Sequence, residues 1–146
     1  MTAIDLSDKM LARAREKAAK RNVKVHLQQM DVQNLQFDDN TFDTVTSNCV
    51  FCSVPDPVRG LREVERVCKP GGKVVMLEHV LSANRILAPL MNLANPVVAR
   101  MMGPNINRRT VENVVKSGLV VEQVTDLELG IFKLIEARKK PDEKQT

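Results

Sequence analysis

The sequence predicts an α/β fold, in which helices flank a mostly parallel sheet and a C-terminal antiparallel hairpin closes it. Short apolar strands alternate with amphipathic helices along most of the chain, an order typical of parallel sheets with helical crossovers. The segment 73–80 (KVVMLEHV) is almost continuously apolar, as expected of a strand buried on both faces. Only Gly130 and its neighbours separate the last two apolar segments, which predicts a hairpin.

Each further element carries a local signal. A helix is predicted over Asp8–Lys20, because apolar residues recur on one face and Ser7 can cap it. A second helix is predicted over 56–69, with Asp56 as its cap and Pro57 in its first turn, and the KPGG turn ends it. The other predicted elements are strands over Thr2–Ile4, Val23–Asp31 and Phe42–Asn48, a helix over Asn107–Gly118, and closing strands over 119–128 and 130–139.

The composition is that of one globular domain in a reducing compartment. Of the 146 residues, 43% are apolar and 27% are charged, which is enough to bury a core. The aromatic content of 3% supplies few rings for base stacking, so we expect no nucleic-acid partner despite a net charge of +4 spread along the chain. The odd number of cysteines (Cys49, Cys52 and Cys68) and the lack of a secretory signal predict a cytoplasmic protein.

The longest apolar-rich segment, 86–103, is too interrupted to cross a membrane. A membrane span needs about 18 consecutive apolar residues. Five residues break the segment: Pro89, Asn92, Asn95, Pro96 and Arg100. We expect it to cover an apolar pocket or to make peripheral contact with a membrane.

Polar groups follow three successive predicted strands. Asp5 ends the first, Asp31 ends the second, and Ser47 and Asn48 end the third. Parallel sheets bind ligands beyond the carboxyl ends of their strands. A carboxylate at Asp5 can accept hydrogen bonds from both hydroxyls of a ribose, and Asp31 can accept one from an exocyclic amine. Together these side chains predict a ligand cleft.

The same segments resemble a known family. The stretches AIDLSDKMLARAR, MDVQNLQFDDNTFDTVTSN, SVPDPVRGLREVERVCKPGGKVVMLEH and SGLVVEQV with GIFKLIEARK are similar to the class I S-adenosylmethionine-dependent methyltransferases, and to their ubiquinone and menaquinone branch. The resemblance covers nearly the whole chain and implies a Rossmann-like fold. Within that branch, VFCSVPDP and GGKVVMLEHV are similar to thiol methyltransferases and phospholipid N-methyltransferases.

The resemblance implies a set of cofactor contacts for S-adenosylmethionine. Asp5 matches the acid that holds the ribose, and Leu6 and Met10 match residues that line the adenosine. Asp31 matches the acid that receives the adenine amine, and Val32 supplies a backbone contact beside it.

The resemblance also implies positions near the methyl that is transferred. Asn48 falls beside the methionine part of the donor. The expected substrate pocket comprises Cys49, Phe51, His79 and Met91. Pro70, Gly71 and Gly72 match a turn that belongs to the fold.

One family feature is missing from the sequence. Family members carry a first strand and a glycine-rich loop before the position of Thr2, and none of the six glycines of this chain lies there. We therefore expect a domain truncated at its N-terminus, without its first strand and helix. Because that strand is central in the family, its loss would open a groove, and self-association could fill it.

Two features of the sequence leave alternatives open. His79 is a candidate general base, although a histidine at a strand end is more often only hydrogen-bonded. The CVFC segment (49–52) has redox spacing, but a role in packing or pocket lining is the default. A single cysteine pair is too small for a structural zinc site, so no metal is expected.

We therefore interpret residues 1–140 as a partial methyltransferase domain, with 84–104 covering the acceptor, and 141–146 as a solvated tail. The predicted function is methyl transfer from S-adenosylmethionine to a small, apolar acceptor such as a quinone precursor, a lipid or a thiol. The alternative is a non-catalytic interaction module that needs a partner chain to complete its sheet. The sequence does not decide whether this chain alone is an active enzyme.

Overall fold

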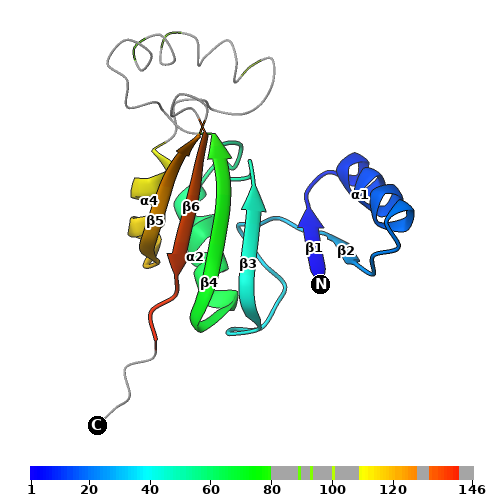
Figure 1. The fold of residues 1–146 in the computed structure, drawn as a ribbon, viewed down its shortest axis with the longest axis horizontal. Helices are drawn as coiled ribbons and strands as arrows, with labels where there is room; N and C mark the ends of the chain where they lie inside the picture. Colours follow the sequence, from blue (N-terminus) through cyan, green and yellow to red (C-terminus); the bar gives the residue numbers. More distant parts are fainter. Residues whose placement is uncertain (80–88, 90–92, 94–99, 101–108, 128–131, 142–146) are drawn as a thin grey trace.

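The computed structural model describes residues 1–79, 89, 93, 100, 109–127 and 132–141 (Figure 1). Its elements are β1 (Thr2–Asp5), α1 (Asp8–Lys20), β2 (His26–Gln29), β3 (Phe42–Asn48), α2 (Pro57–Val67), β4 (Cys68–His79), α4 (Thr110–Ser117), β5 (Val120–Leu127) and β6 (Phe132–Arg138). The predicted α/β class is confirmed. Most of the predicted apolar segment 84–104 lies outside the described residues, which include only Pro89, Leu93 and Arg100 of it. The tail from residue 142 on also lies outside them.

The strands form two sheets. One contains β1 and β2, which run parallel, and the other has the order β3-β4-β6-β5. β4 pairs parallel with β3 and antiparallel with β6, and β5 and β6 form the predicted antiparallel hairpin. Within the described residues β1 and β3 do not pair, although both point the same way and stand next to each other in Figure 1.

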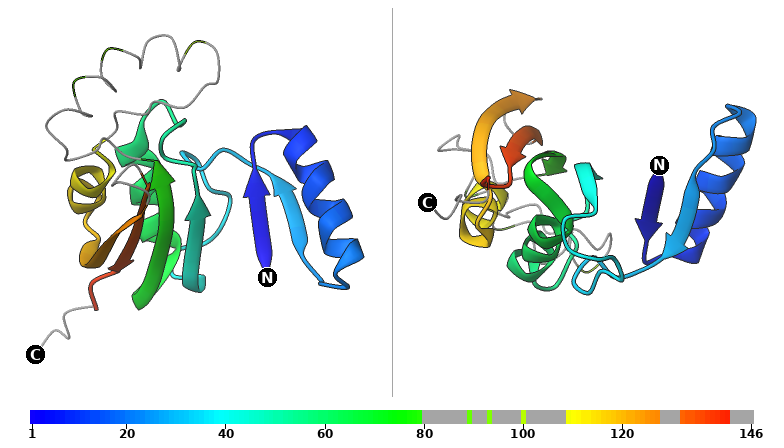
Figure 2. Two further views of the ribbon diagram at one scale, coloured as in Figure 1. Left: turned by 45° about the horizontal axis from the view of Figure 1, so that its top comes forward. Right: turned by 90° about the horizontal axis from the view of Figure 1, so that it is seen from below.

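The hydrophobic core lies under the four-stranded sheet. Figure 2 shows α2 and α4 together on one face of this sheet, whereas α1 accompanies β1 and β2. The core combines inward residues of β4 and β6 with the apolar stripe of α2. Its members are Phe51, Leu61, Val64, Cys68, Val74, Met76, Val114, Leu119, Ile135 and Ala137.

The caps of the helices follow the sequence closely. The Ser7 side chain accepts a hydrogen bond from the Met10 amide at 3.4 Å, and that of Asp56 accepts one from the Arg59 amide at 3.0 Å. Gly118 ends α4 with a φ of 105°, a left-handed conformation that favours glycine. Ser7 and Asp56 therefore fix the starts of α1 and α2, and Gly118 fixes the end of α4.

The boundary between α2 and β4 differs from the prediction. The helix ends at Val67, not at residue 69, and β4 begins at Cys68, five residues before the predicted strand. Cys68 pairs with Phe42, and the Gly71 amide donates to the Lys139 carbonyl at 3.1 Å. The predicted KPGG turn is nevertheless present as a bulge inside β4, because the pairing with β3 jumps from Phe42–Cys68 to Thr44–Lys73 and Gly71 has a φ of 72°.

Candidate functional site

The structure brings the predicted polar strand ends to one edge of the molecule. Asp5 is the last residue of β1, Asp31 lies two residues after β2, and Asn48 is the last residue of β3. The arrowheads of β1 and β3 point to this edge in Figures 1 and 2. Asp5 and Asn48 end their strands as predicted. The second strand was predicted over Val23–Asp31, but β2 spans only His26–Gln29, so Asp31 lies in the segment that follows the strand.

Asp5 has one carboxylate oxygen engaged and one without a hydrogen bond from the described residues. Its Oδ1 accepts from the Ser7 amide at 2.8 Å, which holds the turn between β1 and α1. Leu6 and Met10, which follow it, are 67% and 47% exposed. An apolar pair this exposed, beside an acid at a strand end, fits a nucleoside with its ribose on Asp5.

Asp31 is held by Gln33. Oδ1 of Asp31 accepts from the Gln33 amide at 2.8 Å, and the Gln33 side-chain amide lies 3.3 Å from Oδ1 and 3.2 Å from Oδ2. The Gln33 side-chain carbonyl in turn accepts from the amide of Asp56, the cap of α2. Oδ1 thus receives two contacts and Oδ2 only one, so the second lone pair of Oδ2 keeps acceptor capacity for an amine beside Gln33.

Arg66 anchors the loop that follows β2. Its guanidinium donates to the carbonyl oxygens of Leu35 and Phe37 at 2.9 and 2.8 Å, and to the Asp39 carboxylate at 2.7 Å. It also forms a two-bond pair with Glu63, which lowers the pKa of that carboxyl below its usual value. One side chain of α2 therefore fixes the loop that carries Asp31.

Glu78 organises the turn that follows β3. The carboxylate is fully buried, and its Oε1 accepts from the amides of Val50 and Phe51 at 3.0 and 3.3 Å. Its Oε2 accepts from the Cys52 amide at 3.3 Å. A fourth hydrogen bond comes from the Ser47 hydroxyl at 3.3 Å. Consecutive backbone amides that converge on a carboxylate in this way fix a loop without secondary structure.

The electrostatic state of Glu78 reflects two opposed effects. Burial raises the pKa of the Glu78 carboxyl above its ordinary value, and the amide donors and the Ser47 hydroxyl oppose that rise. The sequence interpretation located Glu78 at the end of a buried strand but gave it no role. The signal was present, because a lone acid in an apolar strand has to be paired.

The residues of the predicted substrate pocket are distributed differently. Cys49 is exposed and adopts a φ of 52°, directly after Asn48. Phe51 is 1% exposed and packs in the core, so its ring offers no surface to an acceptor. The backbone of His79 ends β4, but its side chain and the whole of Met91 lie outside the described residues.

Val32 belongs to the contact between the Asp31 loop and α2. It is half-buried and packs against the core. A Cβ added at Gly60 of α2 would lie 3.3 Å from Val32 Cγ1 and 3.2 Å from Phe51 Cε1. The side chain of Val32 therefore supports the loop, and its backbone remains the candidate contact.

The CVFC segment behaves as a packing element. Cys52 is buried, and its thiol donates to the Cys49 carbonyl at 3.4 Å. Burial raises the pKa of the Cys52 thiol. A raised pKa suppresses the thiolate on which redox exchange depends, which favours the default interpretation of this segment.

Comparisons with known proteins identify a family. Residues 1–76 match the family described as methyltransferase domain. A phosphatidylethanolamine N-methyltransferase of Cereibacter sphaeroides is 46% identical over 81 residues, which cover 54% of this chain and 40% of that protein. A demethylmenaquinone methyltransferase of Staphylococcus haemolyticus is 44% identical over 78 residues, which cover 53% of this chain and 32% of that protein. The match thus spans about two fifths or less of these curated relatives.

Solved structures show the same fold. An S-adenosylmethionine-dependent methyltransferase from Methanosarcina mazei has a TM-score of 0.75 at 21% identity, over 97% of this chain and 82% of that chain. One from Mesorhizobium loti has a TM-score of 0.70 at 24% identity, over 94% and 79% of the two chains. The cyclase SpnF has a TM-score of 0.76 at 19% identity, over 96% and 66%. Because one of these neighbours is a cyclase, the fold alone does not fix the reaction.

Proposed function

The chain belongs to the methyltransferase domain family, within the class I S-adenosylmethionine-dependent methyltransferases, and from this premise we propose that it transfers a methyl group to a small, apolar acceptor. The family indicates S-adenosylmethionine as the cofactor. The proposed cofactor residues are Asp5, Leu6, Met10, Asp31, Val32 and Asn48. They lie at the carboxyl ends of β1, β2 and β3, in the segments that follow, and, for Met10, in the first turn of α1.

The observation that carries the proposal is the shared edge formed by Asp5, Asp31 and Asn48. In the proposed complex Asp5 Oδ2 accepts from the ribose, and Leu6 and Met10 cover the adenosine with their exposed side chains. Asp31 accepts from the adenine amine with the lone pairs that Gln33 leaves. Asn48 then lies toward the reacting methyl.

The proposed reaction asks the protein mainly for orientation. S-adenosylmethionine, when bound, supplies a methyl group already activated on its sulfonium. Correct placement of two reactants can contribute about 7 to 11 kcal/mol to such a step. The Glu78 hydrogen bonds fix the turn after Asn48, so this turn offers a preorganised surface beside the reacting group. His79 stays a candidate base.

The acceptor is proposed as a quinone precursor, a lipid or a thiol. Two relatives are named for phosphatidylethanolamine and for demethylmenaquinone, both of which are amphipathic or apolar molecules. We propose that segment 84–104 covers this acceptor, within a methyltransferase domain over residues 1–140, and that Cys49 and Met91 line its pocket. Residues 141–146 are proposed as a solvated tail. No helix among the described residues is long and apolar enough to cross a membrane.

Calorimetric titration with S-adenosylhomocysteine tests the nucleoside site. We expect binding by the purified chain and its loss in the variant Asp5→Ala. Asp8→Ala is the matched control, because Asp8 is an exposed acid in the first turn of α1, three residues further along the chain. Absence of binding by the folded chain, or equal binding by both variants, would refute the proposed site.

A second candidate function follows from the two separate sheets. In the β1–β2 ladder the carbonyl oxygens of Met1 and Asp5 accept hydrogen bonds from the side of strand β2. Because successive residues of a strand point their backbone groups to opposite sides, the amides and carbonyls of Thr2 and Ile4 face the edge of β1 that is away from β2. On β3 the same alternation aims Thr44 and Thr46 at the facing edge. These two edges favour an interaction module that takes up a strand from a partner chain or a second copy.

The oligomeric state separates this candidate from the enzyme. Light scattering after size exclusion is expected to show self-association that Thr46→Pro abolishes, because proline removes one outward amide and leaves the bonds to β4. The matched control Thr46→Ala keeps that amide and should associate like the wild type. A monomer, or association in the proline variant, would refute pairing at β3.

A further inference from the structure

Basic charge is concentrated in one short part of the chain. Residues 8–24 contain seven Lys and Arg residues but only two acidic ones, a net charge of +5, whereas the whole chain carries +4. The remainder of the molecule is therefore slightly acidic. The sequence interpretation treated the basic residues as spread along the chain. In the structure residues 8–24 form α1 and the segment after it, so these cations are gathered on one element.

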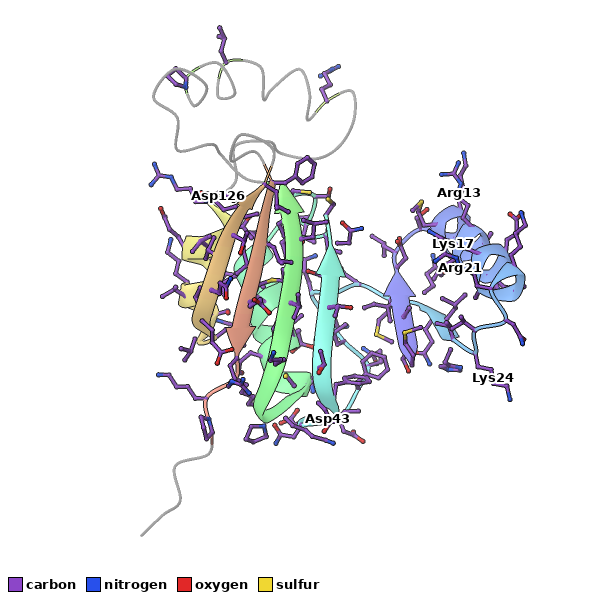
Figure 3. The ribbon with its side chains drawn as sticks, viewed as in Figure 1. Arg13, Lys17, Arg21, Lys24, Asp43 and Asp126 are labelled. Carbon is purple, nitrogen blue, oxygen red and sulfur yellow. The ribbon has the colours of Figure 1, made fainter. Side chains whose placement is uncertain are left out.

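Four of these residues form a basic stripe, defined here as Arg13, Lys17, Arg21 and Lys24. Arg13, Lys17 and Arg21 are spaced four residues apart and share one face of α1 and its C-cap, and Lys24 follows in the connection to β2. All four are exposed, and none forms an ion pair with a described residue. Figure 3 shows them gathered on the α1 side of the molecule, away from β5 and β6.

An apolar groove lies directly beside the stripe. Lys17 and Arg21 line it together with small and apolar residues of α1, β1 and the segment before β2, among them Met1, Ala14, Ala18, Val23 and Val25. Met1 and Val23 are 81% and 46% exposed. Cations that border exposed apolar side chains are the combination by which amphipathic helices bind the interface of an anionic membrane.

We propose that α1 and its basic stripe dock this protein on an anionic lipid surface. The cations attract the headgroup phosphates, and Met1 and Val23 reach toward the acyl boundary. A nucleic acid fits this surface less well, because the residues before Phe37 include no Phe, Tyr or Trp on which bases could stack. Arg13 approaches Met10 Sδ, a proposed adenosine contact, at 4.0 Å. Lys17, Arg21 and Lys24 lie further along α1 and in the connection to β2, and docking is therefore measured without the methyl donor.

Sedimentation with lipid vesicles tests the proposal. Vesicles of phosphatidylcholine with about one third phosphatidylglycerol are compared with pure phosphatidylcholine at low and physiological salt. The wild-type chain is expected to bind only the anionic vesicles, and less strongly as salt rises. The variant Arg13→Gln/Lys17→Gln/Arg21→Gln is expected to lose roughly fivefold in affinity for each charge, or about a hundredfold in all.

A matched variant removes the same charge elsewhere. Arg62→Gln/Lys73→Gln/Lys116→Gln replaces three exposed cations on the other sheet and its helices and should bind nearly like the wild type. Circular dichroism verifies that both variants are folded. The proposal is overturned if the wild type does not bind anionic vesicles, if the two variants lose the same affinity for them, or if the protein binds only a single-stranded DNA probe. Since no methyl donor is present, failure here leaves the proposed reaction untouched.

Discussion

Removal of the Glu78 carboxylate should destabilise the fold and release the turn after β3. In Glu78→Ala the amides of Val50, Phe51 and Cys52 lose their acceptor. Each buried amide left unpaired costs about 1 to 3 kcal/mol. Burial of the carboxylate itself costs several kcal/mol in the wild type, which offsets part of the loss. We expect a net decrease of about 2 to 4 kcal/mol in the free energy of unfolding.

The variant Glu78→Gln removes the negative charge but keeps one acceptor oxygen, so it separates the effects of the two. The Gln oxygen can keep the donors on Oε1, namely Ser47, Val50 and Phe51, while its NH2 group faces the Cys52 amide. The lost bond and the relieved charge burial oppose each other, so we expect a change within about 1 kcal/mol. A small effect in Gln and a large one in Ala would show that acceptor oxygens, rather than charge, hold this turn.

The pH dependence gives an independent test. Burial raises the folded-state pKa of Glu78, so the unfolded state releases the proton first as pH rises. The Glu78 contribution to wild-type stability should therefore fall between the unfolded pKa of about 4.3 and the raised folded value, and stay constant outside this window. Urea unfolding of the wild type and of Glu78→Gln at a series of pH values measures this dependence of the free energy of unfolding. A difference between the two that is constant with pH, or that grows in favour of the wild type as pH rises, would refute the reasoning.

Three further substitutions test the packing of β4 and the loop that carries Asp31. Gly72→Ala should cost about 2 to 3 kcal/mol, because its Cβ would lie 2.7 Å from Cys68 Sγ and 2.8 Å from the Lys69 carbonyl. A Cβ at Gly71 would meet no atom within 4 Å, but the φ of 72° is unfavourable for alanine, so Gly71→Ala should cost about 1 kcal/mol. Thermal melts of the variants measure these losses. Arg66→Gln should cost about 1 to 2 kcal/mol after solvent screening. Since Arg66 lowers the pKa of Glu63, wild-type stability should drop as pH falls through that lowered value, and the variant should show a smaller drop.

The elements of this fold were predictable because their signals are local. The bounds of α1 follow from the Ser7 cap and its apolar face, and the closing hairpin follows from two apolar segments around Gly130. The start of β4 was not predictable from local sequence. Pro70 and two glycines indicate a turn, and the structure keeps it as a bulge within β4, where Gly71 has a φ of 72°. Local sequence does not show the pairing of Cys68 with Phe42, which extends β4 to the N-terminal side of this bulge.

Residue type located the site, but hydrogen-bond geometry decides what each residue can do there. Asp5 and Asp31 look equivalent in the sequence, since both are acids at the ends of short strands. In the structure Asp5 uses one oxygen for the Ser7 amide, whereas Asp31 receives three hydrogen-bond contacts from Gln33. In the proposed complex the ribose therefore meets an open acceptor at Asp5, whereas the amine shares Asp31 with Gln33. Gln33 also accepts a hydrogen bond from the amide of Asp56, the cap of α2, and so links Asp31 to the start of that helix.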